Sequence, residues 1–130
     1  LNEQKIIYTH IGENKKITQD QDMLRNVFIN LISNAMKYSS DEKHVYIQTE
    51  LKDKTAIINV RDEGIGIPEA EQKFLFQKFF RAKNATNLEG TGLGLNIVKR
   101  YLDLMKGTID FKTEENIGTT FKVTIPTEKD

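Results

Sequence analysis

The sequence predicts a two-layer α/β sandwich in which helices cover one face of a mixed β-sheet. Its 130 residues suffice for one hydrophobic core that buries roughly two-thirds of the chain's surface. Segments in which every second residue is apolar alternate with segments in which apolar residues recur every three or four positions. No internal repeat, low-complexity tract or linker interrupts this alternation. We therefore expect residues 1–130 to form a single domain.

The charge balance and the absence of cysteine exclude several classes of protein. Lysine plus arginine and aspartate plus glutamate number 19 each, so the net charge of zero favours neither nucleic acid nor an anionic membrane as a partner. Without cysteine the chain has no disulfide, no cysteine-bound zinc and no thiol nucleophile. No stretch reaches the roughly 20 apolar residues of a membrane span. Because the chain opens on Leu1 and not on methionine, we expect a cytoplasmic domain of a longer, membrane-anchored protein.

The first half of the chain contains a strand, a helix and a hairpin. Residues Lys5 to Ile11 predict a strand, and Asp20 or Asp22 then offers a helix N-cap. The helix is indicated by apolar residues at positions 24, 27, 28, 31, 32 and 35, which form one stripe. A hairpin with its turn at Lys52–Lys54 follows, and its inward residues are Val45 and Ile47, then Ala56, Ile58 and Val60.

The second half contains two helices and two strands. Pro68 marks the start of a short helix, because proline suits a first helical turn. Residues 82–92 are polar and contain glycine, which predicts a mobile loop. A longer amphipathic helix is expected from about Leu93 to Met105, and strands at 108–113 and 119–125 close the chain. The inward residues of the longer helix are Ile97, Val98, Tyr101 and Met105.

Three motifs stand apart from this pattern. They are NLISNAMKYS at 30–39, DEGIGI at 62–67 and GTGLGL at 90–95, with the phenylalanine-rich LFQKFFR at 75–81 between the last two. On a helix, Asn30, Asn34 and Lys37 fall within an arc of about 60° beside the apolar stripe. Glycines before a helix let backbone N–H groups and the helix dipole approach phosphate. The third motif is neither a Walker loop nor a dinucleotide GxGxxG.

In this order and spacing the motifs resemble the ATP-binding domain of bacterial sensor histidine kinases. That domain belongs to the GHKL group with the Bergerat fold, together with DNA gyrase, the MutL repair proteins and the heat-shock ATPase chaperones. The resemblance covers about Lys5 to Pro126. It implies a protein histidine kinase that uses ATP and Mg²⁺, with an ATP lid at about 78–92. The phosphate would pass to a histidine on a separate helical dimerisation domain of the same protein, and then to a response regulator in two-component signalling.

The resemblance also assigns roles on the first predicted helix. Asn34 matches the ligand of Mg²⁺, and Lys37 matches a basic residue that approaches the phosphates. Tyr38 matches a ring against the adenine, with ordinary packing at the helix end as the alternative. Asn30 occupies the position where hydrolysing relatives carry a glutamate that activates water. An amide cannot accept a proton at neutral pH, so this position favours transfer to an acceptor over hydrolysis.

The second motif is expected to hold the base. Asp62 can accept a hydrogen bond from the exocyclic amine of adenine, whereas guanine carries a carbonyl oxygen there. Gly64 and Gly66 let the backbone turn closely around the base, and Ile65 or Ile67 supplies an apolar wall. Near the end of the chain, Gly118 precedes Thr119 and Thr120, which resembles the family's final strand motif. The resemblance implies that a threonine there shares a water with Asp62, and Thr119 is the one included in the predicted site.

The remaining predicted site residues surround the phosphates. Arg81 matches a family arginine that meets the terminal phosphate, and Lys83 is a weaker candidate. Phe76 is included in the site, although it and the neighbouring Phe79 and Phe80 suit packing anchors of the lid better than ligands. The third motif contributes Gly90, Thr91, Gly92, Leu93, Gly94 and Leu95.

Two features separate the chain from a self-sufficient kinase. Neither His10 nor His44 has the sequence context of a phosphoacceptor, so the chain alone is expected to bind ATP without phosphorylating itself. Residues 105–109 read MKGTI where many relatives have two adjacent glycines. The alternatives are a GHKL ATPase driven by nucleotide-dependent dimerisation, or a degenerate module that binds nucleotide or a partner without phosphotransfer.

Overall fold

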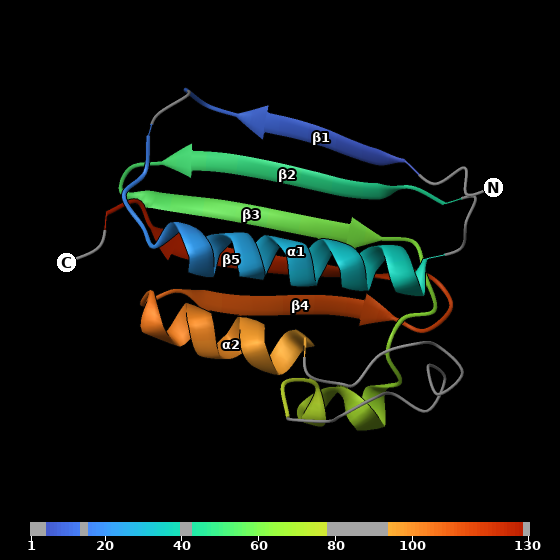
Figure 1. Cartoon of the computed structure of the whole chain (residues 1–130). Helices are drawn as coiled ribbons and strands as arrows, with labels where there is room; N and C mark the ends of the chain where they lie inside the picture. The colour runs from blue at the N-terminus through green and yellow to red at the C-terminus, as the bar shows by residue number, and fades with distance from the viewer. Residues whose placement is uncertain (1–4, 14–15, 40–42, 78–93, 129–130) are drawn as a thin grey trace.

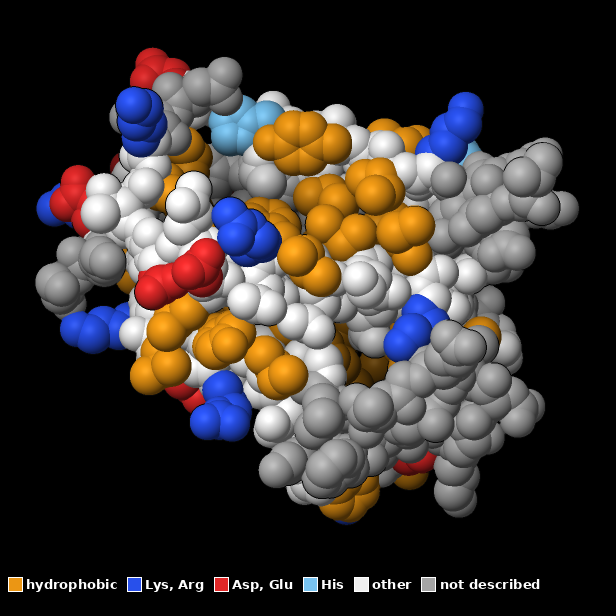
Figure 2. Space-filling view, viewed as in Figure 1, with side chains coloured by type: hydrophobic (Ala, Val, Ile, Leu, Met, Phe, Trp, Pro, Cys, Tyr) orange, Lys and Arg blue, Asp and Glu red, His pale blue; other side chains and the backbone are white. Residues whose placement is uncertain are grey.

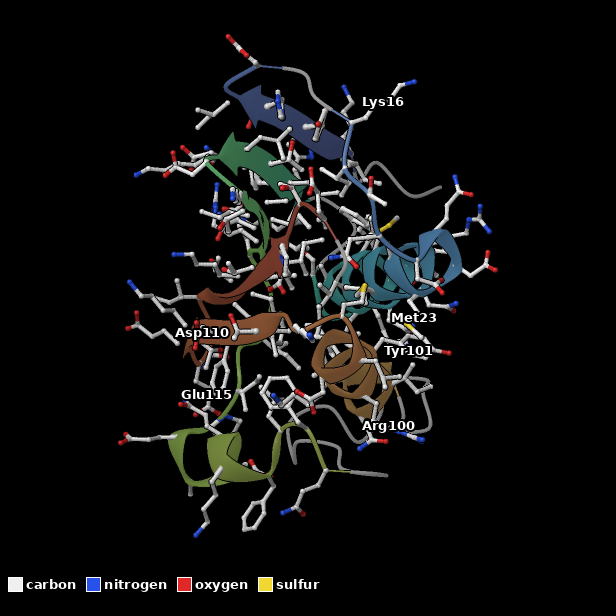
Figure 3. The ribbon with its side chains drawn as sticks, turned by 90° about the vertical axis from the view of Figure 1, so that its left-hand side faces the viewer. Lys16, Met23, Arg100, Tyr101, Asp110 and Glu115 are labelled. Atoms are coloured by element: carbon white, nitrogen blue, oxygen red, sulfur yellow. The ribbon has the colours of Figure 1, made fainter. Side chains whose placement is uncertain are left out.

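The computed structural model describes residues 5–13, 16–39, 43–77 and 94–128. Within them five strands form one sheet in the order β1-β2-β3-β5-β4, and both α-helices lie on the same face of it (Figures 1 and 3). The β1–β2 pair is parallel and the other pairs are antiparallel, so the predicted mixed sheet with helices on one face is confirmed. The elements are β1 (Ile6–Ile11), α1 (Gln21–Tyr38), β2 (Val45–Lys52), β3 (Thr55–Asp62), the 3₁₀ helix η1 (Glu69–Phe74), α2 (Gly94–Leu104), β4 (Thr108–Glu114) and β5 (Gly118–Pro126).

Helix α1 forms where the apolar stripe predicts it. Of the two candidate caps the structure selects Asp20, whose side chain accepts a hydrogen bond from the Met23 N–H at 3.0 Å. This bond satisfies one of the N–H groups that have no partner inside the helix. Val27, Leu31 and Ala35 face the sheet and are buried. Each large buried side chain of this kind contributes roughly 1.5–3 kcal/mol to the free energy of unfolding.

The β2–β3 hairpin confirms the second sequence prediction. Lys52 pairs with Thr55, so Asp53 and Lys54 form a two-residue turn, and Asp53 has a positive φ of 56°. Such turns match the twist of the two strands. Residues 56, 58 and 60 of β3 are buried against the helices, whereas the alternate residues face the other side of the sheet. On that side the guanidinium of Arg61 lies 4.0 Å above the centre of the Tyr46 ring, consistent with a solvated, polar face.

Helix α2 buries a residue that the sequence analysis did not include. Val98 and Met105 are buried as predicted, but Leu102 is also fully buried and was not among the expected inward residues. The reason is that α2 packs both on the sheet and on α1, which widens the arc of the helix that faces the core. The short helix that was predicted to start at Pro68 is the 3₁₀ helix η1, and Pro68 occupies its N-cap position.

The C-terminal end of α2 closes with a backbone motif that usually requires glycine. The Gly107 N–H donates to the Leu102 carbonyl at 2.8 Å and the Lys106 N–H to the Asp103 carbonyl at 3.2 Å, which is the Schellman pattern. Lys106 has a φ of 61°, in the left-handed region. A glycine at position 106 would adopt this conformation without steric cost.

No helix in the described ranges is both long enough and apolar enough to cross a lipid bilayer.

Candidate functional site

The first and second motifs meet at one end of the sheet, and the last glycine of the third lies beside the first. The Ile65 N–H, in the acidic glycine turn, donates to the carbonyl of Tyr38 at the end of α1, at 3.3 Å. A Cβ added at Gly94, the first residue of α2, would lie 3.2 Å from Oδ1 of Asn30. The face of α1 that carries the asparagines is therefore flanked by the turn after β3 and by the N-terminus of α2.

Asp62 is the buried charge of this region. It is the last residue of β3, and only 6% of its surface is exposed. Its Oδ1 accepts hydrogen bonds from the Gly64 N–H at 2.9 Å and from the Thr119 N–H at 3.2 Å. Burial raises the pKa of Asp62 from 3.8 to about 6, against the lowering effect of these two bonds and of the Arg61 guanidinium. The carboxylate is ionised at pH 7 but held in an environment that opposes its charge.

A pair of threonines supports the turn beside Asp62. The hydroxyl of Thr113, on β4, accepts a hydrogen bond from the Ile67 N–H at 3.0 Å and lies 2.8 Å from the hydroxyl of Thr119. Thr119 in turn donates its N–H to Asp62, so three strands are joined through one chain of polar contacts. Thr113 was not predicted from the sequence. Because side chains alternate along β4, Thr113 lies on the same face as Ile109 and Phe111, toward the helices. This alternation is the sequence pattern from which its position could have been predicted.

The glycines of the second motif are required by backbone packing. A Cβ at Gly64 would lie 2.1 Å from the Tyr38 carbonyl oxygen, and one at Gly66 would lie 2.2 Å from the Glu114 carbonyl oxygen. Gly66 also has a φ of 68°. The sequence analysis predicted that these glycines open space around a base. In the structure the space left by each missing side chain is filled by another part of the chain.

Among the described residues, one side-chain amide on the polar face of α1 has no hydrogen-bond partner. Asn30 Nδ2 donates to the Asn26 carbonyl at 2.7 Å, so this amide is tied to its own helix. The half-buried amide of Asn34 makes no hydrogen bond to another described residue. Lys37 is exposed one turn further on. A half-buried amide oxygen that no described residue occupies, one turn from a lysine, fits a Mg²⁺ ion that is also held by phosphate oxygens.

Phe76 packs at the edge of the core. Its ring lies 6.0 Å from that of Phe111 at an edge-to-face angle, and the ring of Phe111 lies 6.2 Å from that of Phe121. Its carbonyl accepts a hydrogen bond from Asn96 Nδ2 at 3.1 Å, which ties the start of the phenylalanine segment to α2. Contact between Phe76 and a nucleotide stays a prediction.

Several predicted site residues lie outside the described residues, and their roles stay predictions. They include the whole of the expected lid at 78–92, with Phe79, Phe80, Arg81, Lys83, Gly90, Thr91 and Gly92, and also Leu93.

Comparison with known proteins identifies the family. Residues 19–129 match the family described as histidine kinase-, DNA gyrase B- and HSP90-like ATPases. The chain belongs to this family. The match includes the whole of α1, the turn after β3 and α2, which are the elements that build the site.

Among members of this ATPase family, the chain is similar to histidine kinases in both sequence and structure. It is 39% identical over 114 residues to the signal transduction histidine-protein kinase ArlS of Staphylococcus aureus. That alignment covers 86% of this chain and 25% of ArlS, so the chain spans about a quarter of the length of the curated relatives it matches. A mycobacterial sensor histidine kinase, MprB, superimposes with a TM-score of 0.83 at 25% identity, over 98% of this chain and 86% of that one. Full-length ShkA in complex with AMPPNP gives a TM-score of 0.81 at 25% identity, over 95% of this chain and 25% of that one.

Proposed function

We propose that this histidine-kinase-like ATPase domain binds Mg·ATP and donates the γ-phosphate to a histidine on a separate helical domain of the same protein. A response regulator would receive the phosphate afterwards, in two-component signalling, and the intact protein would hold this domain on the cytoplasmic side of a membrane anchor. The observation that carries the proposal is the buried carboxylate of Asp62 at the end of β3, where the following turn packs against Tyr38 at the end of α1.

The state of Asp62 supports selectivity for adenine. Both backbone donors reach the same oxygen, Oδ1, and the second carboxylate oxygen makes no hydrogen bond to another described residue. That oxygen is available to the exocyclic amine of adenine. Guanine would present a carbonyl oxygen to it and would be repelled. A charged hydrogen bond of this kind is worth about 1.5–3 kcal/mol, which corresponds to roughly tenfold or greater discrimination.

The phosphate end of the proposed site combines one amide and several positive groups. Asn34 would hold Mg²⁺ through its amide oxygen, and the bound ion supplies charge neutralisation between the phosphates. Lys37 and Arg81 would approach the phosphate oxygens directly. Gly94 and Leu95, the first residues of α2, would bring backbone N–H groups and the positive end of the helix dipole to the phosphates. The contribution of these residues to phosphotransfer is positioning and charge stabilisation.

Asn30 favours transfer over hydrolysis, the principal alternative. A hydrolysing enzyme needs a general base near the attacking water. Here the corresponding position carries an amide whose nitrogen donates to the Asn26 carbonyl of the same helix. ATP turnover by the chain alone is therefore expected to be slow compared with transfer to a histidine.

Two measurements test the proposal. In calorimetric titrations, ATP and ADP are expected to bind the chain and GTP is not, and Mg²⁺ should strengthen the binding of ATP. The substitution Asp62→Asn should abolish the binding of adenine nucleotides. In a transfer assay, the chain is expected to label a separately produced helical domain that carries the phosphoacceptor histidine of the same protein. A folded chain that binds no adenine nucleotide at millimolar concentration would overturn the whole proposal. Binding without transfer would reduce it to a nucleotide-binding module.

A further inference from the structure

Asp62 is the first member of a row of three polar side chains that crosses the sheet. It pairs with Thr119 of β5, and Thr119 pairs in turn with Thr113 of β4. Cross-strand partners project from the same face of a sheet, so all three side chains stand on the side that the helices cover. The row lies where β3 and β4 end and β5 begins (Figure 1). On this side the surface is hollowed between α1 and the start of α2 (Figure 2), so the row stands on the side from which a ligand can enter.

Two members of the row already have roles in the proposed site, whereas Thr113 has none. Asp62 is expected to accept a hydrogen bond from the exocyclic amine of adenine, and Thr119 to share a water with it. Thr113 lies on the far side of Thr119, two strand spacings of about 4.8 Å from the strand of Asp62. Any effect of Thr113 on the base must therefore pass through a neighbouring residue.

The hydroxyl of Thr113 has more neighbours than it has hydrogens. Its oxygen accepts a hydrogen bond from the Ile67 N–H at 3.0 Å. It also lies 3.2 Å from the Gly118 carbonyl oxygen and 2.8 Å from Oγ1 of Thr119. A hydroxyl carries one hydrogen, so Thr113 can donate to Gly118 or to Thr119 but not to both at once. The row consequently has two possible arrangements of its hydrogen bonds.

In the first arrangement the hydroxyl hydrogens point away from Asp62. Thr119 donates to Thr113, and Thr113 donates to the carbonyl of Gly118. Both hydroxyl hydrogens then have a partner inside the protein. This is favourable because Thr119 is only 6% exposed, and a buried donor without a partner lowers the stability of a protein. We expect this arrangement in the nucleotide-free protein.

In the second arrangement the hydrogens point toward the site. Thr113 donates to Thr119, and the hydroxyl hydrogen of Thr119 then has no other partner among the described residues. This hydrogen is available to a bound base or to a water held by the base. The change gives up only the longest of the three contacts of Thr113, the one of 3.2 Å to Gly118. The ring nitrogen N1 of adenine, next to the exocyclic amine, is an acceptor for such a hydrogen, so adenine held by Asp62 favours the second arrangement.

We propose that Thr113 is a positioning residue for the base, which directs the hydroxyl hydrogen of Thr119 toward the ring nitrogen N1 of adenine, directly or through one water. This role rests on the proposed function, because it concerns how the same site recognises its nucleotide. Thr113 does not touch the base. Its hydroxyl reverses its own hydrogen bond when adenine binds, and it thereby makes Thr119 a donor.

Calorimetric titration with two nucleotides separates this role from simple support of the turn through Ile67. The probes are ATP and 1-deaza-ATP, in which a C–H group replaces N1 while the exocyclic amine and the triphosphate are kept. One neutral hydrogen bond corresponds to about fivefold in affinity, so the unsubstituted chain should bind ATP about fivefold more tightly than 1-deaza-ATP. In Thr113→Val this ratio is expected to fall below about twofold, because Thr119 has lost the donor that keeps its hydrogen directed at the base.

The substitution Thr113→Val leaves the other supports of the turn in place. The Ile65 carbonyl still accepts from the Asn116 N–H at 2.7 Å, and the Ile65 N–H still donates to the Tyr38 carbonyl at 3.3 Å. Urea denaturation of each variant establishes that it is folded before titration, and Thr113→Ala takes the place of the valine variant if that one is unfolded. Thr113→Ser keeps the hydroxyl and should keep the fivefold ratio. Thr108→Val, at an exposed threonine of the same strand, is the matched control and should also keep it.

The possible results distinguish this role from the function on which it rests. If Thr113→Val weakens the binding of both nucleotides equally and keeps the fivefold ratio, Thr113 only supports the turn, and the role is overturned while the proposed function stands. A ratio near one in the unsubstituted chain would overturn it as well, because N1 then receives no hydrogen bond from the site. If the folded, unsubstituted chain binds neither nucleotide, the role and the proposed function fall together.

Discussion

Replacing Asp62 with asparagine is expected to stabilise the nucleotide-free protein while it abolishes adenine binding. Burial raises the pKa of Asp62 from 3.8 to about 6, so the folded state binds the proton more tightly than the unfolded state. Between these two values the free energy of unfolding falls as pH rises, by about 1.4 kcal/mol per pH unit, and about 3 kcal/mol is lost above pH 6. An asparagine carries no charge, and its oxygen still accepts from the N–H groups of Gly64 and Thr119.

The size of the stabilisation depends on pH in a way that identifies its cause. Asp62→Asn is expected to raise the free energy of unfolding by about 1 kcal/mol at pH 4.5 and by up to about 3 kcal/mol at pH 8. For a chain of this length the gain at pH 8 corresponds to an increase in Tm of roughly 10 °C. Urea denaturation of both proteins without nucleotide, at the two pH values, measures the difference directly.

A matched substitution separates this effect from a general change in charge. Asp110→Asn removes an exposed carboxylate on β4, and the free energy of unfolding is expected to change by less than about 0.5 kcal/mol at either pH. The reasoning is refuted if Asp62→Asn is no more stable than the unsubstituted chain at pH 8, or if its advantage is the same at both pH values.

Three further substitutions test other parts of the structure. Lys106→Gly should raise the free energy of unfolding by about 1 kcal/mol in thermal or urea denaturation, since it removes a side chain from a left-handed backbone with a φ of 61°; no gain would contradict the helix-end geometry. Gly64→Ala should lower the free energy of unfolding by about 3 kcal/mol, because its Cβ would lie 2.1 Å from the Tyr38 carbonyl oxygen, and wild-type stability would disprove that packing. Asn34→Ala should reduce Mg²⁺-dependent ATP affinity in calorimetry by about tenfold or more while leaving Mg²⁺-free binding unchanged; an equal loss under both conditions would argue against a metal ligand.

The sequence determined the elements and the motifs of this protein. The stripe of α1, the alternation of β2 and β3 and the turn between them are local patterns, and each is present in the structure at the predicted place. Apolar periodicity is decided within a few residues of the chain, so it can be read without knowing what the element packs against. The order of the three motifs was sufficient for the family, which the match over residues 19–129 then established.

The tertiary structure decided which residues of each element are buried, which of them enter the site, and how the environment shifts the pKa of Asp62. Leu102 is buried because α2 contacts two neighbours, and Thr113 enters the site because β5 inserts between β3 and β4. The environment of Asp62 arises from a residue 57 positions away, Thr119, and from the burial that strand pairing produces. These features depend on contacts between distant segments, and local patterns in the sequence carry no information on how distant segments pack.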